Sequence, residues 1–337
     1  MKPVLLWVGM LLALTLVAAA IAWWWLLRPQ TLSWPEHQGA LRELTTQHGD
    51  RLRTWQLYLP GNGRAASGLM VVLHGSRQSG KSFRRWTAHG LDALADRHGF
   101  AVAYLDGVEG HWNDCRKQGN FAAKTLRIDD VGFLRRVIDT VSREHGIAPR
   151  RTALLGYSNG GHMALRFALE GADDLAAVVM IGASVPADEN FICAAGKVAA
   201  PVMLVSGTQD PINPYEGGRV VLLGSDRGSV RSAMDSARWL AGADAQEVVM
   251  PGGALPAAAT SSLVVEDRLW RSTSRPPVRL VTVRGGGHTV PQPHVRFPRL
   301  LGDTAMQFDA LAQAVTFAGL ASGIQQPSAP AIASQPR

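Results

Sequence analysis

The segment ALLGYSNGG, residues 153–161, joins a short apolar run to a serine that has glycine two positions before it and two after it. Gly156, Gly160 and Gly161 permit a helix to approach a strand closely around a sharp turn. Ser158 stands at the centre of that turn, where a nucleophile is exposed at the edge of a sheet. The pattern Gly-x-Ser-x-Gly alone is weak. Its position between an apolar run and a helical segment makes Ser158 the predicted nucleophile.

Two further segments supply the partners that a serine nucleophile needs. The apolar run 202–205 leads to Asp210, and the run 278–283 leads through three glycines to His288. An acid orients the histidine, and the histidine takes the serine proton, so the chain order serine, acid, histidine predicts a catalytic triad. Two alternatives stay open: Asp210 as a surface residue that opens a proline turn, and His294 as the base.

Two backbone N–H groups are predicted to stabilise the oxyanion of such a reaction. The first belongs to Asn159, because N–H groups at the start of a helix have no partner within the helix and lie at its positive end. The second belongs to Ser76, in the loop after the apolar run 69–73, with Arg77 as the alternative donor. His74 in the same loop is expected to brace the loop by hydrogen bonding.

Apolar runs alternate with helical periodicities over most of the chain. Short runs of this kind suit strands buried on both faces of a parallel sheet. The expected strands are 54–59, 69–73, 100–105, 152–155, 175–183, 202–205 and 278–283. The expected helices are 81–98, 129–145, 159–170, 229–241 and 304–319. Alternation of strand and helix predicts an α/β fold with a doubly wound, mostly parallel sheet.

The remaining segments define the expected domain limits. Residues 29–52 are interpreted as a polar stalk, so that the catalytic domain extends over 53–320. Residues 251–277, rich in Ala, Gly, Pro and Ser, are expected to form a long loop. Residues 321–337 have no periodic apolar side chains and are expected to be a disordered tail.

An uncharged apolar segment precedes the expected stalk. No charged residue occurs from Pro3 to Leu27, a run longer than the roughly 20 residues that span a bilayer. Three tryptophans at 23–25 close it as an interfacial aromatic belt would. Residues 1–28 are therefore expected to be a transmembrane anchor, with the catalytic domain extracytoplasmic, in the periplasm or at the cell surface. A signal peptide cleaved near the alanines 18–20, releasing a secreted protein, is the alternative.

Composition and spacing argue against two other kinds of partner. The net charge is +7, but the arginines are scattered and no basic stripe is interleaved with aromatic residues, so nucleic-acid binding is not expected. No spacing of potential ligands is typical of a metal site. The only two cysteines, Cys115 and Cys193, form either one disulfide or two separate thiols. Nothing in the sequence indicates an oligomeric state.

Taken in order, these segments resemble the polyhydroxybutyrate depolymerase and feruloyl esterase-like family of α/β-hydrolases. The resemblance covers about residues 53–290. The matching motifs are Leu73-His74-Gly75, Tyr104-Leu105-Asp106-Gly107 with Trp112-Asn113-Asp114, Asp129-Asp130-Val131-Gly132-Phe133, Gly156-Tyr157-Ser158-Asn159-Gly160-Gly161, Gly207-Thr208-Gln209-Asp210-Pro211 with Asn213-Pro214-Tyr215-Glu216-Gly217-Gly218, and Gly287-His288.

This resemblance implies an α/β-hydrolase fold, the triad Ser158, Asp210 and His288, and no cofactor. It also implies that Trp112 and Asn113 line the mouth of the substrate pocket, although Trp112 equally fits a loop residue that packs on the core. Tyr157, inside the nucleophile motif, is expected to contact substrate as well.

The predicted function is hydrolysis of carboxylic esters through an acyl-enzyme. A tethered chain without a polymer-binding domain favours soluble esters or hydroxyalkanoate oligomers as substrates. A feruloyl-type esterase and a serine peptidase or amidase are alternatives, because the same triad cleaves amides. A non-catalytic binding protein of the cell envelope is a further alternative, since the fold alone does not determine function.

Overall fold

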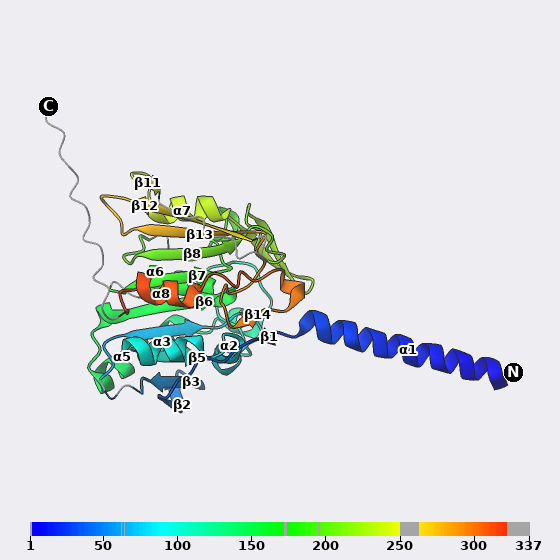
Figure 1. The fold of residues 1–337 in the computed structure, drawn as a ribbon. Coiled ribbons are helices and arrows are strands. Elements are labelled where there is room, and N and C mark those ends of the chain that lie inside the picture. The colour runs from blue at the N-terminus through cyan, green and yellow to red at the C-terminus, as the bar shows by residue number, and fades with distance from the viewer. Residues whose placement is uncertain are drawn as a thin grey trace.

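A computed structural model describes residues 2–321 apart from 62, 64, 172–173, 195 and 250–262. Helix α1 (Lys2–Leu27) projects from an α/β domain that contains the rest of the described chain (Figure 1). The expected tail from 322 onward, and the part of the expected loop at 251–262, lie outside the described residues.

The domain is built on one ten-stranded sheet with the order β11-β12-β13-β8-β7-β6-β4-β5-β3-β2. The six strands from β13 to β5 are parallel, and the two strands at each edge are antiparallel. The bounds are β2 Ala40–His48, β3 Arg51–Leu59, β4 Leu69–Leu73, β5 Ala101–Leu105, β6 Thr152–Tyr157, β7 Ala177–Ile181, β8 Val202–Gly207, β11 Gln246–Val249, β12 Val264–Arg271 and β13 Val278–Arg284. The predicted mostly parallel sheet is confirmed.

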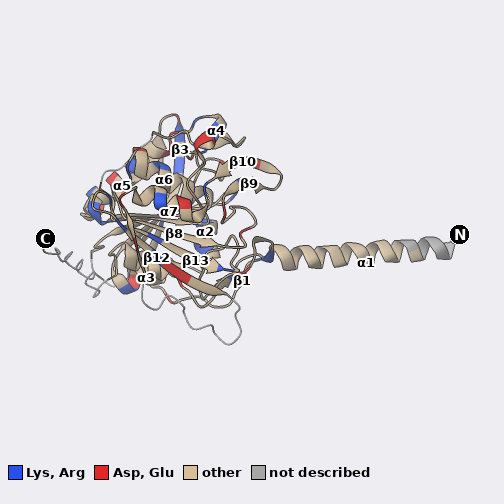
Figure 2. Cartoon of the chain, turned by 90° about the horizontal axis from the view of Figure 1, so that it is seen from above, with Lys and Arg blue, Asp and Glu red and all other residues tan. Residues whose placement is uncertain are grey.

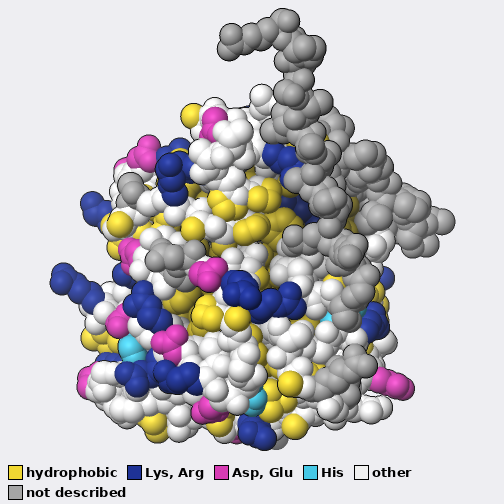
Figure 3. Space-filling model, turned by 90° about the vertical axis from the view of Figure 1, so that its left-hand side faces the viewer, with side chains coloured by type: hydrophobic (Ala, Val, Ile, Leu, Met, Phe, Trp, Pro, Cys, Tyr) yellow, Lys and Arg dark blue, Asp and Glu magenta, His cyan; other side chains and the backbone are white. Residues whose placement is uncertain are grey.

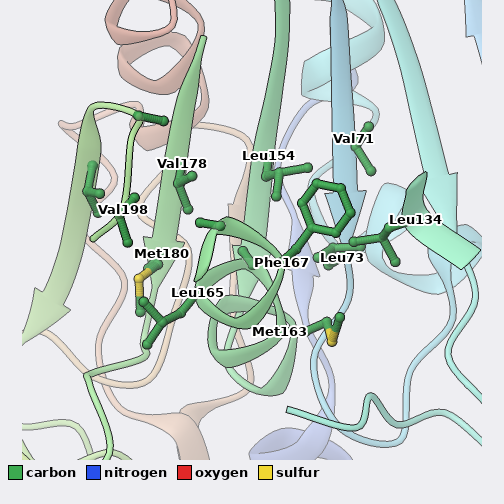
Figure 4. Close-up of a cluster of buried hydrophobic side chains, with 14 of the residues drawn as sticks. Val71, Leu73, Leu134, Leu154, Met163, Leu165, Phe167, Val178, Met180 and Val198 are labelled. Atoms are coloured by element: carbon green, nitrogen blue, oxygen red, sulfur yellow. The ribbon is translucent and has the colours of Figure 1, made fainter. Parts of the chain in front are cut away.

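Helices cover both faces of this sheet, which makes the fold doubly wound. One hydrophobic core lies between the sheet and α5 (Asp130–His145), α6 (Asn159–Glu170) and α7 (Ala233–Ala241). The other core lies under α2 (Gly80–Trp86), α3 (Gly90–His98) and α8 (Ala310–Phe317). In the first core, α6 contributes apolar side chains from two sides of the helix: Figure 4 shows Leu165 towards Met180, and Phe167 on the other side, towards Leu73.

The shorter elements lie in the connections and are listed here with their bounds: β1 Gln30–Thr31, α4 Ala122–Thr125, η1 Pro149–Arg151, η2 Asp188–Asn190, β9 Gly218–Leu222, β10 Ser225–Val230, β14 Val295–Arg296 and η3 Arg299–Leu301. Two small antiparallel pairs stand apart from the main sheet, one formed by β9 and β10 and the other by β1 and β14. Both pairs become important for the candidate site.

Three of the expected helices have different bounds. The helix expected over 81–98 is two helices, because Ala88 and His89 take positive φ angles of 46° and 57° that interrupt the hydrogen-bonding pattern. The helix expected from 229 begins after Ser232, whose hydroxyl accepts a hydrogen bond from the Asp235 N–H, and β10 occupies the residues before it. Asp309 caps α8 in the same way, so this helix begins at 310 and not at 304.

The interpretation of residues 29–52 as a stalk is wrong. Strand β2 pairs with β3 from Ala40↔Leu59 to His48↔Arg51 and forms one edge of the main sheet. Its side chains alternate only weakly between exposed and half-buried positions. The reason is that β2 is an edge strand, which pairs with another strand on one side and borders solvent on the other. The expected loop over 251–277 is also wrong in part, since β12 occupies residues 264–271.

Helix α1 is the helix of the described chain that is long and apolar enough to cross a membrane. The window Gly9–Leu27 has a mean hydropathy of 2.2 and no buried side chains. A signal sequence near the N-terminus has the same properties, so this observation agrees with both alternatives for residues 1–28.

The two cysteines form a disulfide between Cys115 and Cys193. The bridge joins loops that are 78 residues apart in the chain. Closing a loop of this size restricts the unfolded chain and typically stabilises a protein by about 2–4 kcal/mol. Of the two alternatives for the cysteines, the structure has the bridge.

Candidate active site

Ser158 lies on a sharp turn between β6 and α6, as the segment 153–161 predicts. Its backbone has φ 54° and ψ −118°, a conformation that is costly for a residue with a side chain. Glycines make the turn possible. A Cβ on Gly156 would overlap the Gly160 carbonyl, and a Cβ on Gly160 would overlap the Leu73 carbonyl. The strained turn holds the Ser158 hydroxyl clear of both the strand and the helix.

The structure brings the three predicted triad residues together from segments far apart in the chain. The Ser158 Oγ lies 2.9 Å from His288 Nε2, and His288 Nδ1 lies 2.7 Å from Asp210 Oδ2. The side chains of His288 and Asp210 are 3% and 2% exposed. These contacts form a continuous hydrogen-bonded chain from hydroxyl to carboxylate.

Both partners of Ser158 are held in place by further hydrogen bonds. Asp210 Oδ1 accepts the N–H groups of Ile212 and Asn213 at 2.8 and 2.7 Å, which leaves Oδ2 for the imidazole. The backbone N–H of His288 donates to Leu301 O at 2.6 Å, and its carbonyl accepts the Tyr157 hydroxyl at 2.7 Å. The imidazole is therefore positioned through its own backbone as well as through the carboxylate.

The alternative base His294 lies elsewhere in the fold. Its Nδ1 is 2.7 Å from the Ser33 hydroxyl, beside the β1–β14 pair. Because this imidazole is engaged with Ser33, the geometry favours His288 as the partner of Ser158.

The loop after β4 presents the second predicted oxyanion donor. The N–H of Arg77 donates to Gly110 O at 2.8 Å, so it is occupied. Among the hydrogen bonds of the described residues, none engages the N–H of Ser76, and Ser76 lines the same pocket as Ser158. The N–H of Asn159 follows Ser158 directly, in the first turn of α6, where N–H groups have no partner within the helix. Ser76 and Asn159 thus remain the two candidate donors.

Comparison with known proteins assigns this site to a class of enzymes. Residues 129–221, which contain Ser158 and Asp210, match the Phospholipase/Carboxylesterase family. The chain is also 30% identical over 290 residues to the putative esterase NocK of Nocardia uniformis subsp. tsuyamanensis, covering 79% of each chain. The chain belongs to the α/β-hydrolase esterases. The fold of this esterase is also that of the acetyl xylan esterase from Aspergillus awamori, with a TM-score of 0.53, 13% identity, and coverage of 84% of this chain and 100% of that chain.

Trp112 and Asn113 do not line the pocket of this esterase, contrary to the expectation. Trp112 is fully buried in the core, and its Nε1 donates to His74 O at 2.9 Å. The Asn113 side chain donates to Ile128 O at 2.9 Å, and its N–H donates to Asp130. The polar atoms of both residues make hydrogen bonds that stabilise the loop after β5. Tyr157 does lie in the pocket wall, although its hydroxyl is bound to the His288 carbonyl.

A buried charge cluster fastens this loop to the start of α6. The Asn159 side chain donates to Asp114 at 2.6 Å and also contacts the backbone of Trp112. Burial would raise the pKa of Asp114, but the adjacent Arg116 guanidinium, at 2.5 Å, and Lys124 outweigh it and hold that pKa below its usual range. Asp114 is therefore a buried carboxylate that fixes the residue carrying a candidate oxyanion N–H. Cys115, which follows it, ties the loop to Cys193.

The pocket in front of Ser158 has a volume of about 440 Å³. Ser158 and His288 line it together with Tyr157, Ser76 and Arg77. Most of the other lining side chains are apolar, and they come from the β9–β10 hairpin, from η3 and its neighbours, and from Trp86, Pro211 and Ile212. This composition suits an apolar acyl group.

One group of side chains in the described chain has the composition of a metal site. Ligand atoms of His37, His89 and Asp92 lie within 4.8 Å of one another. The two imidazoles are hydrogen-bonded at 3.0 Å, and the Asp92 oxygens bind Arg84 Nε and Tyr104 OH. These contacts satisfy the three side chains without a cation, so the group is explained as a structural cluster.

His74 braces the loop that carries Ser76, and this gives a pH-dependent prediction. Its Nε2 accepts the Gly107 N–H at 2.9 Å, and its Nδ1 donates to Gly75 O at 2.7 Å. Burial lowers its pKa from 6.5 to about 4, so the folded protein keeps this histidine neutral while the unfolded chain takes up a proton. Its contribution to stability is complete above pH 6.5 and is lost as the pH falls towards 4. Between pH 7 and 5 we expect about 2 kcal/mol of lost stability from this residue.

Urea unfolding of the wild type and of His74→Gln at pH 7 and pH 5 measures this effect. The variant should be less stable than the wild type at pH 7 but should lose less stability on acidification, because no imidazole remains to be protonated. Equal losses in the two proteins would assign the acid sensitivity to other groups.

Proposed function

We propose that this esterase hydrolyses carboxylic esters through a covalent acyl-enzyme on Ser158. The observation that carries the proposal is the hydrogen-bonded chain Ser158–His288–Asp210, at 2.9 and 2.7 Å, on the wall of an apolar pocket. A binding protein would have no use for a strained serine aligned on a buried imidazole and carboxylate.

In the first half-reaction, Ser158 Oγ attacks the ester carbonyl while His288 Nε2 takes the hydroxyl proton. Asp210 keeps the other imidazole proton on Nδ1 and stabilises the imidazolium. The N–H groups of Ser76 and Asn159 bind the oxyanion of the tetrahedral intermediate. His288 then gives its proton to the departing alkoxide, and the alcohol leaves.

In the second half-reaction, water replaces the alcohol. His288 Nε2 removes a proton from water as the oxygen attacks the acyl carbon, and it returns that proton to Ser158 Oγ when the acid is released. Every step uses side chains of this chain and a water molecule. The residues near Ser158 thus suffice for the reaction without a metal ion.

The substrate class within the esterases is part of the proposal. The mostly apolar pocket wall favours an apolar acyl group, which is compatible with hydroxyalkanoate oligomers and with the resemblance to polyhydroxybutyrate depolymerases. Feruloyl esters and amides are the alternatives that a substrate panel must contain. Acetylated polysaccharide is not favoured, because the relative that acts on it by name is similar in fold alone.

We also propose an extracytoplasmic location, with α1 as the membrane anchor. The apolar exposed surface of α1 supports an anchor, and the Cys115–Cys193 disulfide supports an oxidising compartment. Secretion after cleavage of α1 is the alternative.

The proposal is tested with the full chain in detergent. We expect a fluorophosphonate probe to label the protein once, on the peptide that contains Ser158, and esters of a panel from acetyl to long acyl, with feruloyl and 3-hydroxybutyrate oligomer esters, to compete with labelling. Labelling at another serine, or hydrolysis of amides alone, would overturn the esterase mechanism.

A further inference from the structure

The end of helix α1 forms part of the pocket wall. Leu27, its last residue, lines the same pocket as Ser158 and His288. The Arg299 guanidinium lies 3.7 Å from the centroid of the Trp25 ring, which joins the last turn of α1 to η3. Leu300, on the same short helix as Arg299, also lines the pocket. The candidate anchor and the candidate catalytic centre therefore meet at one place.

The chain between α1 and the domain leaves little freedom for them to separate. Helix α1 ends at Leu27, and β1 begins at Gln30 and pairs with β14. The N–H of Leu32 donates to His294 O at 2.8 Å. The chain continues from β14 to Leu301, and the Leu301 carbonyl accepts a hydrogen bond from the His288 N–H. Figure 1 shows α1 leaving the domain beside β1 and β14.

The level of the membrane surface follows from α1 itself. Its 26 residues span about 39 Å, enough to cross the hydrocarbon core. No charged residue occurs in α1 from Pro3 to Leu27, and Figure 2 shows the coloured part of the helix tan up to the domain. The exposed tryptophans 23–25 stand at the domain end of the helix, where an aromatic belt marks the interface. A bilayer around α1 would thus have its surface at the mouth of the pocket.

Exposed apolar side chains surround that mouth. Leu223 at the tip of the β9–β10 hairpin is 71% exposed and Leu300 is 55% exposed, and both line the pocket. The face turned away from α1 carries Lys, Arg, Asp and Glu side chains on both sides of a band of apolar ones (Figure 3). Exposed apolar groups next to a membrane helix are typical of a surface that contacts lipid.

The hairpin tip shows a local conflict that a role at the interface explains. Leu223 and Gly224 form a two-residue turn in which both φ angles are positive, at 49° and 76°. Such turns favour Asn-Gly, and leucine is strained there. The chain thus keeps an exposed, strained leucine at a position where asparagine would suit both the backbone and water.

We propose that the pocket opens on the membrane surface and that the esterase takes its acyl group from an amphiphilic ester resident in the bilayer. The acyl chain passes between the β9–β10 hairpin and η3 to reach Ser158 without crossing water. This inference rests on the proposed function and narrows its substrate class. It replaces the expectation of soluble esters, because the tether here brings the pocket to the substrate.

The position of the pocket is tested without reference to activity. The full chain is reconstituted in phosphatidylcholine–phosphatidylglycerol vesicles, and a polarity-sensitive dye is attached to Leu223→Cys, Leu300→Cys or Arg150→Cys. The native cysteines are joined in the disulfide, so the introduced thiol is the one labelled. Arg150, exposed in η1 at the amino end of β6, lies at the opposite edge of the sheet and is the control.

We expect lipids that carry a nitroxide to quench the dyes at 223 and 300 at least about twofold and to leave the dye at 150 unchanged. Absence of quenching at 223 and 300, in protein that floats with the vesicles, would overturn the inference even if Ser158 reacts with fluorophosphonate.

The substrate class is tested by Leu223→Asn, which removes the apolar tip and relieves the strained turn. We expect thermal stability to be kept or increased, while the ratio of the rates on a vesicle-resident long-chain ester and on a water-soluble short-chain ester falls about tenfold. An unchanged ratio would overturn the interfacial substrate. If no ester is hydrolysed and Ser158 is not labelled, the proposed function and the acyl substrate both fail, and quenching still decides where the pocket lies.

Discussion

The Ser158→Ala variant is expected to lose about 10⁴-fold or more in kcat on the best ester of the panel. The substitution removes the oxygen that forms the acyl bond, and with it the hydroxyl that donates to His288 Nε2. It keeps the Cβ, so the strained turn between β6 and α6 changes little. The loss is therefore chemical, and the thermal unfolding midpoint should stay close to that of the wild type.

A matched serine controls for the substitution itself. Ser272, on the exposed turn after β12, binds Asp244 and lies outside the pocket, so Ser272→Ala should keep wild-type kcat. Residual hydrolysis by Ser158→Ala that is within tenfold of the wild type would assign the nucleophile to another group.

The central strands could be predicted from sequence because their environment leaves a simple pattern. Strands such as β4, β6 and β8 are buried along their whole length, so they read as continuous apolar runs. Ser158, Asp210 and His288 follow three of the parallel strands, and the carboxyl ends of such strands meet at one edge of a sheet. Their approach to hydrogen-bonding distance could therefore be predicted from their order, whereas their catalytic roles await the variants.

The edge strand β2 could not be predicted, because it leaves no comparable pattern. Its sequence, ALRELTTQH, is polar and mostly exposed, since only one side of it is covered by another strand. The break at residues 88 and 89 was missed for a related reason. The helix breaks because Ala88 and His89 take positive φ angles, and neither alanine nor histidine signals such a conformation in the sequence.

The residues that support the site were missed because their partners are distant in sequence. A buried Asp114 is neutralised by Arg116 nearby, but its contact with Asn159 is created only by the fold. The same holds for Leu27, which lines the pocket although it ends the expected anchor, whereas the Cys115–Cys193 bridge is one of the two alternatives that the sequence left open. A tryptophan in a glycine-rich loop was assigned to the pocket, while the structure uses the Trp112 ring in the core.

The Asp210→Asn variant is expected to lower kcat about 10⁴-fold through the wrong imidazole tautomer. Asp210 Oδ1 already accepts two backbone N–H groups, so the asparagine carbonyl oxygen must take that position. Its amide nitrogen then faces His288 Nδ1 and donates to it. The imidazole proton moves to Nε2, where it blocks acceptance of the Ser158 proton.

A comparison with Asp210→Ala separates the effect of the wrong tautomer on kcat from the effect of losing the carboxylate charge. Asp210→Ala leaves Nδ1 free to keep its proton, so it should retain at least as much activity as Asp210→Asn, although it loses the turn formed with Ile212 and Asn213 and unfolds at lower temperature. The rate of fluorophosphonate labelling should follow the same order as kcat, because labelling also requires a deprotonated Ser158. If Asp210→Asn kept activity within tenfold of the wild type, a different group would have to orient His288, and the hydrogen bond of 2.7 Å between His288 and Asp210 would be structural and not catalytic.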